Sequence, residues 1–216
     1  MSEPQSRYLV VEGPIGVGKT SLAKRLAKTF GGEPLLEHAE ENPFLERFYR
    51  DPKGAALPVQ LSFLFQRARQ LQALRQGDIF TPLRVADFML EKDRLFAQLN
   101  LDDDELGLYE QVYQHLTLDA PAPDMVVYLQ APIEVLMQRV VKRGVGYEQF
   151  IQREYLTRIA EAYSRFFYHY ERSPLLIVNA ADINPVDSEE DYQLLVRELS
   201  RVKSGRHYFN PGRTPA

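Results

Sequence analysis

Residues 8–20 read YLVVEGPIGVGKT, and this stretch decides the fold class. It opens with an apolar run over residues 8–11, which predicts a buried β-strand. Residues 13–20 then match the pattern G-x-x-x-x-G-K-[ST]. Helical periodicity follows as far as Gly31, where glycine is a common helix stop. A strand, a glycine-rich loop and a helix in this order predict a nucleotide-binding α/β domain.

Each residue type in this loop has a chemical task. Glycines let backbone N–H groups curl around a phosphate at the positive end of a helix. Lys19 neutralises the β and γ oxygens, and Thr20 offers a hydroxyl to Mg²⁺. The alternative, a turn without a ligand, is disfavoured by the position between a strand and a helix. The expected nucleotide-binding residues are Gly13, Gly16, Val17, Gly18, Lys19, Thr20 and Ser21.

Composition narrows the class of protein. The 216 residues include 26 Lys plus Arg against 30 Asp plus Glu, a net charge of −4 that disfavours polynucleotide binding through a broad basic surface. The absence of cysteine excludes disulfides and thiolate metal sites and favours a cytoplasmic protein. No apolar run approaches the roughly 18 residues of a membrane span, and the polar residues 1–7 do not resemble a secretory signal.

Further apolar runs predict four more strands, separated by helical patterns. These strands are expected at residues 34–37, 83–87, 125–129 and 175–178. The alternation predicts βαβ units and a five-stranded parallel sheet flanked by helices.

The helical patterns include a long helix over residues 57–75, ending at Gly77-Asp78, and another over residues 148–170. We expect one domain over residues 1–203. Residues 204–216 contain two prolines and two glycines and predict a flexible tail.

Two carboxylates follow predicted strands. Ligands of open parallel sheets bind beyond the carboxyl ends of strands, which makes Glu37 a candidate base and Asp87 a candidate Mg²⁺ ligand. Each has a plainer alternative, because Glu37 begins an acidic surface-like stretch and Asp87 can cap a helix.

Two helix faces carry further candidates. Gln60 and Arg67 are about 10.5 Å apart along a helix at nearly one azimuth, where an amide and a guanidinium can meet a nucleobase or simply face solvent. Arg139 and Arg143 share a face before Gly144, where they can close over transferring phosphates or complement a helix dipole. With no guanine-reading N-K-x-D segment, these features favour a small-molecule kinase over a GTPase.

Together these segments resemble the deoxyribonucleoside kinase family, especially the bacterial deoxyadenosine and deoxyguanosine kinases, over most of the chain. The likeness rests on the phosphate loop, on LEHAEENPFL at residues 36–45, on YLQAP at residues 128–132, on Arg143-Gly144 and on EYL at residues 154–156. It implies a P-loop kinase fold with a lid, ATP and Mg²⁺ as cofactors, and a homodimer.

The resemblance also implies residue roles. Glu37 would be the catalytic base, with Lys19, Arg139 and Arg143 stabilising charge. Thr20 and Asp87 would hold the metal. Base and sugar contacts would come from Tyr49, Gln60, Arg67, Asp93 and Glu148.

Two positions depart from the family pattern. Phe88 follows Asp87 where an arginine is usual, and Val145 stands where a lid arginine is usual. Each loss removes a charge that would offset the transition state. Candidates to supply the missing charge are Arg84, Arg94 and Arg153.

The leading hypothesis is transfer of the ATP γ-phosphoryl group to the 5'-hydroxyl of a deoxyribonucleoside, with a purine favoured. One alternative is a nucleoside monophosphate kinase, which would need added cations for the acceptor phosphate. Another is a degenerate kinase that binds nucleotides as a sensor or partner module.

Overall fold

The computed structural model describes residues 8–75, 83–117, 120–181 and 183–210, whose strands form one parallel sheet in the order β2-β3-β1-β4-β5-β6. The strands are β1 (Tyr8–Glu12), β2 (Glu33–Leu35), β3 (Arg84–Ala86), β4 (Met125–Gln130), β5 (Leu175–Asn179) and β6 (Arg206–Phe209). The α-helices are α1 (Lys19–Thr29), α2 (Leu45–Arg50), α3 (Ala56–Arg75), α4 (Glu91–Asn100), α5 (Asp103–Thr117), α6 (Ile133–Arg143), α7 (Arg153–Tyr168) and α8 (Glu189–Arg201). Two 3₁₀ segments, η1 (Ala39–Glu41) and η2 (Gly146–Phe150), complete the order.

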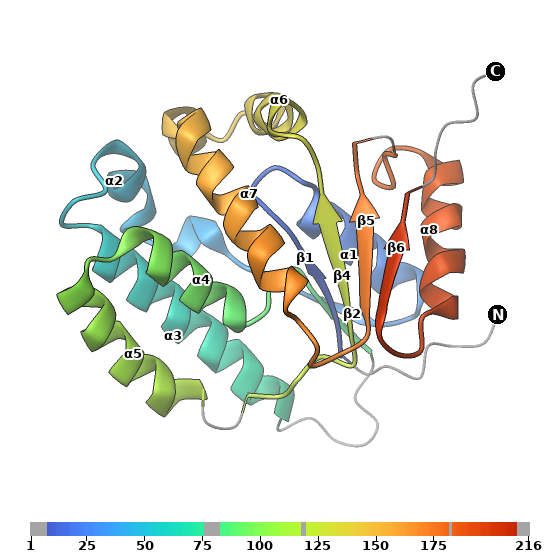
Figure 1. Cartoon of the computed structure of the whole chain (residues 1–216), viewed down its shortest axis with the longest axis horizontal. Helices are drawn as coiled ribbons and strands as arrows, with labels where there is room; N and C mark the ends of the chain where they lie inside the picture. Colours follow the sequence, from blue (N-terminus) through green and yellow to red (C-terminus); the bar gives the residue numbers. More distant parts are fainter. Residues whose placement is uncertain (1–7, 76–82, 118–119, 182, 211–216) are drawn as a thin grey trace.

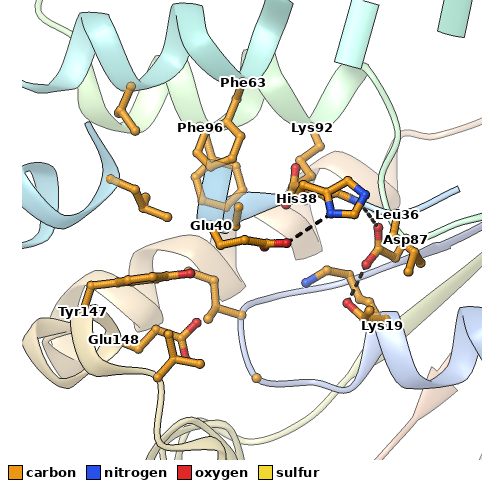
Figure 2. Close-up of a pocket in the computed structure, with 18 of the residues that line it drawn as sticks. Lys19, Leu36, His38, Glu40, Phe63, Asp87, Lys92, Phe96, Tyr147 and Glu148 are labelled. Carbon is orange, nitrogen blue, oxygen red and sulfur yellow. Dashed lines mark hydrogen bonds and ion pairs between the residues drawn. The ribbon is translucent and has the colours of Figure 1, made fainter. Parts of the chain in front are cut away.

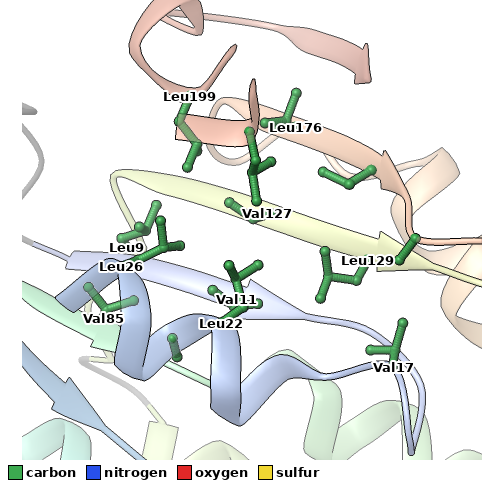
Figure 3. Close-up of a cluster of buried hydrophobic side chains, with 14 of the residues drawn as sticks. Leu9, Val11, Val17, Leu22, Leu26, Val85, Val127, Leu129, Leu176 and Leu199 are labelled. Atoms are coloured by element: carbon green, nitrogen blue, oxygen red, sulfur yellow. The ribbon is translucent and has the colours of Figure 1, made fainter. Parts of the chain in front are cut away.

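Helices cover both faces of the sheet (Figure 1). Side chains of β1 alternate between two cores, because Leu9 and Val11 pack with α1, α6 and α8, whereas Val10 packs with α3, α4, α5 and α7. Figure 3 shows Leu22 and Leu26 of α1 in the first of these cores, beside Leu9 and Val11. This two-sided burial explains why the central strands are apolar runs without a polar face.

The parallel α/β fold is confirmed, but the sheet has six strands instead of the predicted five. The sixth, β6, lies in the segment predicted as a flexible tail. It pairs with β5, and the N–H of Leu175 donates to the carbonyl of Gly205 at 2.9 Å. The side chain of Arg206 adds a bond to the carbonyl of Tyr168 at 2.7 Å. Strand pairing at a sheet edge therefore orders residues that have little apolar surface to bury.

The predicted helix over residues 148–170 is also corrected, because η2 and α7 are separate. Ile151 and Gln152 between them have extended backbone, with ψ angles of 115° and 148°. Ile151 is buried in the core beside α1 and α8, and this packing overrides helical continuity. The predicted helix end at Gly77-Asp78 and the tail residues 211–216 lie outside the described residues.

Candidate active site

The loop between β1 and α1 has the backbone that its glycines predict. Gly13, Gly16 and Gly18 have φ angles of 149°, 84° and 103°, which side-chain-bearing residues rarely adopt. A Cβ on Gly13 would lie 2.4 Å from the carbonyl oxygen of Leu129. The side chain of Val17 is buried in the core, so only its backbone is available to a ligand. The strand, loop and helix order expected of a phosphate loop is confirmed.

Lys19 begins α1 and closes this loop on itself. Its ammonium donates to the carbonyl oxygens of Gly13 at 2.8 Å and Pro14 at 3.1 Å. Burial, and next the charge of Lys92, lower the pKa of Lys19 to about 8. A second cation therefore lies close enough to Lys19 to disfavour its charge, which is the situation that a bound phosphate would relieve.

Asp87, at the end of β3, connects the phosphate loop to the opposite wall. Its two carboxylate oxygens accept from different segments, Oδ2 from the hydroxyl of Thr20 and Oδ1 from the N–H of Glu37 at 2.7 Å. Asp87 is 2% exposed. The sheet order places β3 between β1 and β2, so this one carboxylate can reach both neighbours.

A cavity of about 370 Å³ opens at this end of the sheet (Figure 2). Lys19, Thr20 and Asp87 line it on the phosphate-loop side. Aromatic rings from α3, α4, α7, η2 and the segment around α2 line the rest, namely Phe48, Tyr49, Phe63, Phe96, Tyr147, Tyr155 and Tyr163. A cavity in which aromatic rings and charged groups converge is typical of a small-molecule site.

Glu37 lies two residues beyond β2 on the cavity wall, and both of its carboxylate oxygens are held by cations. Oε1 accepts from Arg67, with Nε at 2.8 Å, and Oε2 accepts from Lys92 Nζ at 3.0 Å. Burial acts to raise the pKa of Glu37, but the charges of Arg67 and Lys92 lower it to about 2. Glu37 is therefore ionised and fixed in direction at neutral pH.

Arg67 connects Glu37 to a second carboxylate. Its Nη1 donates to Asp93, which is 0% exposed and also accepts from the hydroxyl of Tyr109 at 2.8 Å. Burial raises the pKa of Asp93 despite the opposing charge of Arg67. Asp93 is not among the residues that line the cavity, and its contact is with Arg67, which it anchors. Its contact with the base stays a prediction.

Gln60 lines the cavity. It lies one turn of α3 before Phe63 and two turns before Arg67, so the three side chains share one face of the helix. The side chain is 3% exposed, and its Oε1 has no hydrogen-bond partner. A buried acceptor without a partner costs free energy unless a ligand satisfies it. The predicted pairing of Gln60 and Arg67 on one cavity wall agrees with this geometry.

Tyr49 and Glu148 face the cavity from α2 and η2. The ring of Tyr49 stacks on Tyr147 with centroids 6.1 Å apart. Burial raises the pKa of Tyr49, and the charge of Glu148 raises it further. Glu148 also accepts from Arg143 Nε at 2.9 Å, so the predicted lid arginine is held against η2.

A second hollow of about 530 Å³ lies on the other side of the phosphate loop. It is lined by residues 16–21, by cations of α6 and by residues 184–187. Arg139 is one of these cations, and it donates to the carbonyls of Val17 at 3.2 Å and Ala180 at 3.0 Å. Arg139 thus braces the loop, whereas Arg143 lines both hollows.

Sequence reasoning missed Lys92, which lines the cavity and contacts Glu37. The three arginines suggested as replacements for the missing family charges lie elsewhere. Each forms an ion pair with a carboxylate away from the cavity: Arg84 with Glu33, Arg94 with Glu110 and Arg153 with Glu134. Phe88 is fully buried in the core and Val145 lies on the cavity wall.

Thr20 and Asp87 suit Mg²⁺, because both offer hard oxygen donors and lie in hydrogen-bond contact. Within the described residues, no group of three or more His, Cys, Asp and Glu side chains could hold a metal alone. The remaining ligands would come from nucleotide phosphates and water, as is usual for Mg²⁺ in kinases.

A parallel sheet with a phosphate loop, a Thr-Asp pair and a facing carboxylate is typical of P-loop enzymes that act on the terminal phosphate of a nucleotide. The model of the family described as deoxynucleoside kinase matches residues 9–203. The chain belongs to the deoxynucleoside kinase family, which confirms the resemblance inferred from its motifs. Its members transfer a phosphoryl group to a deoxynucleoside.

Individual relatives agree with this assignment. The chain is 34% identical over 161 residues to a deoxyguanosine kinase of Bacillus subtilis, covering 72% of this chain and 76% of that protein. It is 26% identical over 207 residues to the deoxyadenosine/deoxycytidine kinase of the same organism, covering 92% and 94%. A solved deoxyadenosine kinase of M. mycoides with bound dATP has a TM-score of 0.76 and 25% identity, covering 89% of this chain and 99% of that one.

No helix in the described part of the chain is both long and apolar enough to span a membrane.

Proposed function

We propose that this protein transfers the γ-phosphoryl group of ATP, with Mg²⁺, to the 5'-hydroxyl of a deoxyribonucleoside, and that purine nucleosides are preferred. The observation that carries the proposal is the placement of Asp87, which touches Thr20 on the phosphate loop and Glu37 on the acceptor wall. The groups that would bind the metal and accept the proton thus lie side by side in one cavity.

The residues divide the work between two substrates. The hollow beside the phosphate loop would hold ATP, with Lys19 and Arg143 near its terminal phosphates. The aromatic cavity would hold the deoxynucleoside, with its base beside Gln60 and Arg67 and its sugar beside Tyr49 and Glu148. Bound Mg²⁺ would neutralise the negative charge of the phosphate oxygens.

In the chemical step, the 5'-hydroxyl proton passes to Glu37 as the hydroxyl oxygen bonds to the γ-phosphorus. The bond from that phosphorus to the β-γ bridging oxygen breaks, and ADP leaves. Most of the rate enhancement in such transfers comes from positioning and charge stabilisation, so a carboxylate with a pKa of about 2 can serve if its direction is fixed.

The purine preference is supported by the relatives named deoxyguanosine kinase and deoxyadenosine kinase. The orphaned Oε1 of Gln60 can accept from a base N–H. Arg67 and Lys92 are both paired with Glu37, whose negative charge would repel an acceptor phosphate, and this disfavours a nucleoside monophosphate substrate.

The test is a substrate panel. Purified protein with ATP and Mg²⁺ is incubated with each of the four deoxynucleosides and, separately, with their monophosphates, and products are separated by chromatography. We expect 5'-monophosphates from deoxyadenosine or deoxyguanosine. Glu37→Gln should remove turnover while deoxynucleoside affinity, measured by calorimetry, stays within about threefold.

Two outcomes would contradict the proposal. Phosphorylation of monophosphates alone would identify a nucleoside monophosphate kinase. Nucleotide binding without any turnover would identify a sensor or partner module.

We further propose a cytoplasmic homodimer, supported by the family resemblance and by the absence of cysteine. Light scattering of the purified protein would give the oligomeric state, and a monomer at micromolar concentration would contradict the proposal.

A further inference from the structure

Lys92 is placed where elementary rules disfavour a lysine. It lies in the first turn of α4, at the positive end of the helix dipole, and is only 5% exposed. Burying an ammonium there costs free energy unless a partner compensates. Local rules are most often broken at functional sites, so this position needs a functional explanation.

The contacts of Lys92 supply one. Its Nζ lies 3.0 Å from Glu37 Oε2, while Arg67 binds the other oxygen, Oε1. The carboxylate is therefore held from two directions, by helices α3 and α4. An ammonium has three hydrogens, and the contact with Glu37 uses one of them.

Lys92 also faces the cavity in which the reaction would occur (Figure 2). Lys19 lies on the phosphate-loop side of this cavity, and the charge of Lys92 is one of the causes that lower its pKa. Two lysines that repel one another across a cavity are an arrangement suited to an anion between them.

The fold explains why the side chain at position 92, and not the one at position 88, contacts Glu37. Phe88 is 0% exposed and packs in the core with Val10 and Leu64. Lys92, four residues later, instead lines the cavity.

We propose that Lys92 is a positioning residue for phosphoryl transfer, which fixes Glu37 Oε2 toward the acceptor hydroxyl and provides, beside Glu37, the positive charge that the sequence lacks at position 88. The proposal rests on the proposed function. Lys92 stays protonated throughout the step, and the hydroxyl proton goes to Glu37. Its effect on rate therefore passes through Glu37.

The test uses Lys92→Met, which keeps the length of the side chain and removes the charge. Because fixed groups of this kind are worth about 100-fold in kcat, we expect a loss of that order, with KM for ATP and deoxynucleoside changed less than about threefold. Lys92→Arg restores the charge and should recover most of the lost kcat. Arg94→Met, which removes an exposed cation of α4 paired with Glu110, should leave kcat unchanged.

A double-mutant cycle with Glu37→Gln separates action through Glu37 from direct contact with phosphate. If Lys92 acts through Glu37, adding Lys92→Met to Glu37→Gln lowers the residual single-turnover rate by less than about threefold, because effects of residues that act as a unit do not multiply. Circular dichroism and thermal melts establish that each variant is folded. If Lys92→Met does not fold, Lys92→Gln, which keeps a hydrogen-bond donor, is used in its place.

Three results would overturn the proposal. These are an unchanged kcat in folded, uncharged variants, a change confined to KM, and losses that multiply in the double variant. Failure of the unaltered protein to phosphorylate any deoxynucleoside would instead overturn the proposed function, and the two failures are thereby distinguished.

Discussion

Replacement of Arg67 by methionine should be strongly destabilising. Arg67 is 3% exposed and is bonded to two carboxylates, Glu37 at 16% side-chain exposure and Asp93 at 0%. Methionine keeps much of the aliphatic stem but leaves both carboxylates without the guanidinium. Breaking a buried ion pair from one side costs about 3–5 kcal/mol, because an uncompensated charge stays behind.

In a chain of 216 residues, a loss of this size lowers the melting temperature by roughly 10 °C. Urea unfolding at pH 7, followed by circular dichroism, gives the free energy of unfolding directly. Arg69→Met is the matched control, because Arg69 lies on the same helix with an exposed side chain. It should change stability by no more than about 0.5 kcal/mol.

The pH dependence of this loss has a definite sign. In the native protein, Glu37 has a folded pKa of about 2 against an ordinary value of 4.5, so its pairing stabilises the fold above pH 4.5 and this contribution is lost as pH falls toward 2. Without Arg67, burial raises the pKa of both carboxyl groups in the folded variant, so the variant takes up protons there as pH falls and loses less stability to buried charge. The difference in free energy of unfolding between the unaltered protein and Arg67→Met should therefore narrow as pH falls from 7 to 4.

Neutralising the fully buried carboxylate should rescue the variant. Adding Asp93→Asn to Arg67→Met removes the uncompensated charge at Asp93, while Glu37 keeps Lys92 as its partner, and should recover at least half of the lost stability. A loss below about 1 kcal/mol in Arg67→Met, or no recovery in the double variant, would refute the buried network inferred from these contacts.

Three further predictions concern the two ligand sites. Gly13→Ala should weaken ATP binding by about tenfold or more, because the φ of 149° at this position and the nearby Leu129 carbonyl disfavour a Cβ. Gly107→Ala, where a Cβ would meet no other atom, should leave ATP affinity unchanged. Equal ATP affinities of the two variants would contradict this prediction. ATP affinity should fall as pH rises through about 8, where Lys19 loses its proton, and calorimetry showing a flat profile would exclude that role. Gln60→Met should preserve or raise stability by removing an orphaned acceptor, yet raise the deoxynucleoside KM by about tenfold, whereas an unchanged KM would remove Gln60 from the site.

Local sequence was sufficient for the phosphate loop. The requirement for positive φ at Gly13, Gly16 and Gly18, and the apolar run of β1 before them, are properties of neighbouring residues. The same holds for the face of α3, since the spacing of Gln60 and Arg67 fixes their common direction whatever else surrounds the helix. These features follow from backbone geometry and periodicity, which act over a few residues.

The pairing of the remaining groups depended on tertiary structure. Lys92 meets Glu37 across 55 residues, and Asp87 reaches Thr20 across 67, because the sheet order places β3 between β1 and β2. Asp93 contacts Arg67 across 26 residues, and the packing of α4 against α3 decides this pairing. The strand β6 and the break before α7 likewise arise from pairing and burial with distant segments. Long-range packing selects among conformations that local propensity leaves nearly equal in free energy, so a linear pattern could name the candidates but could not place them together.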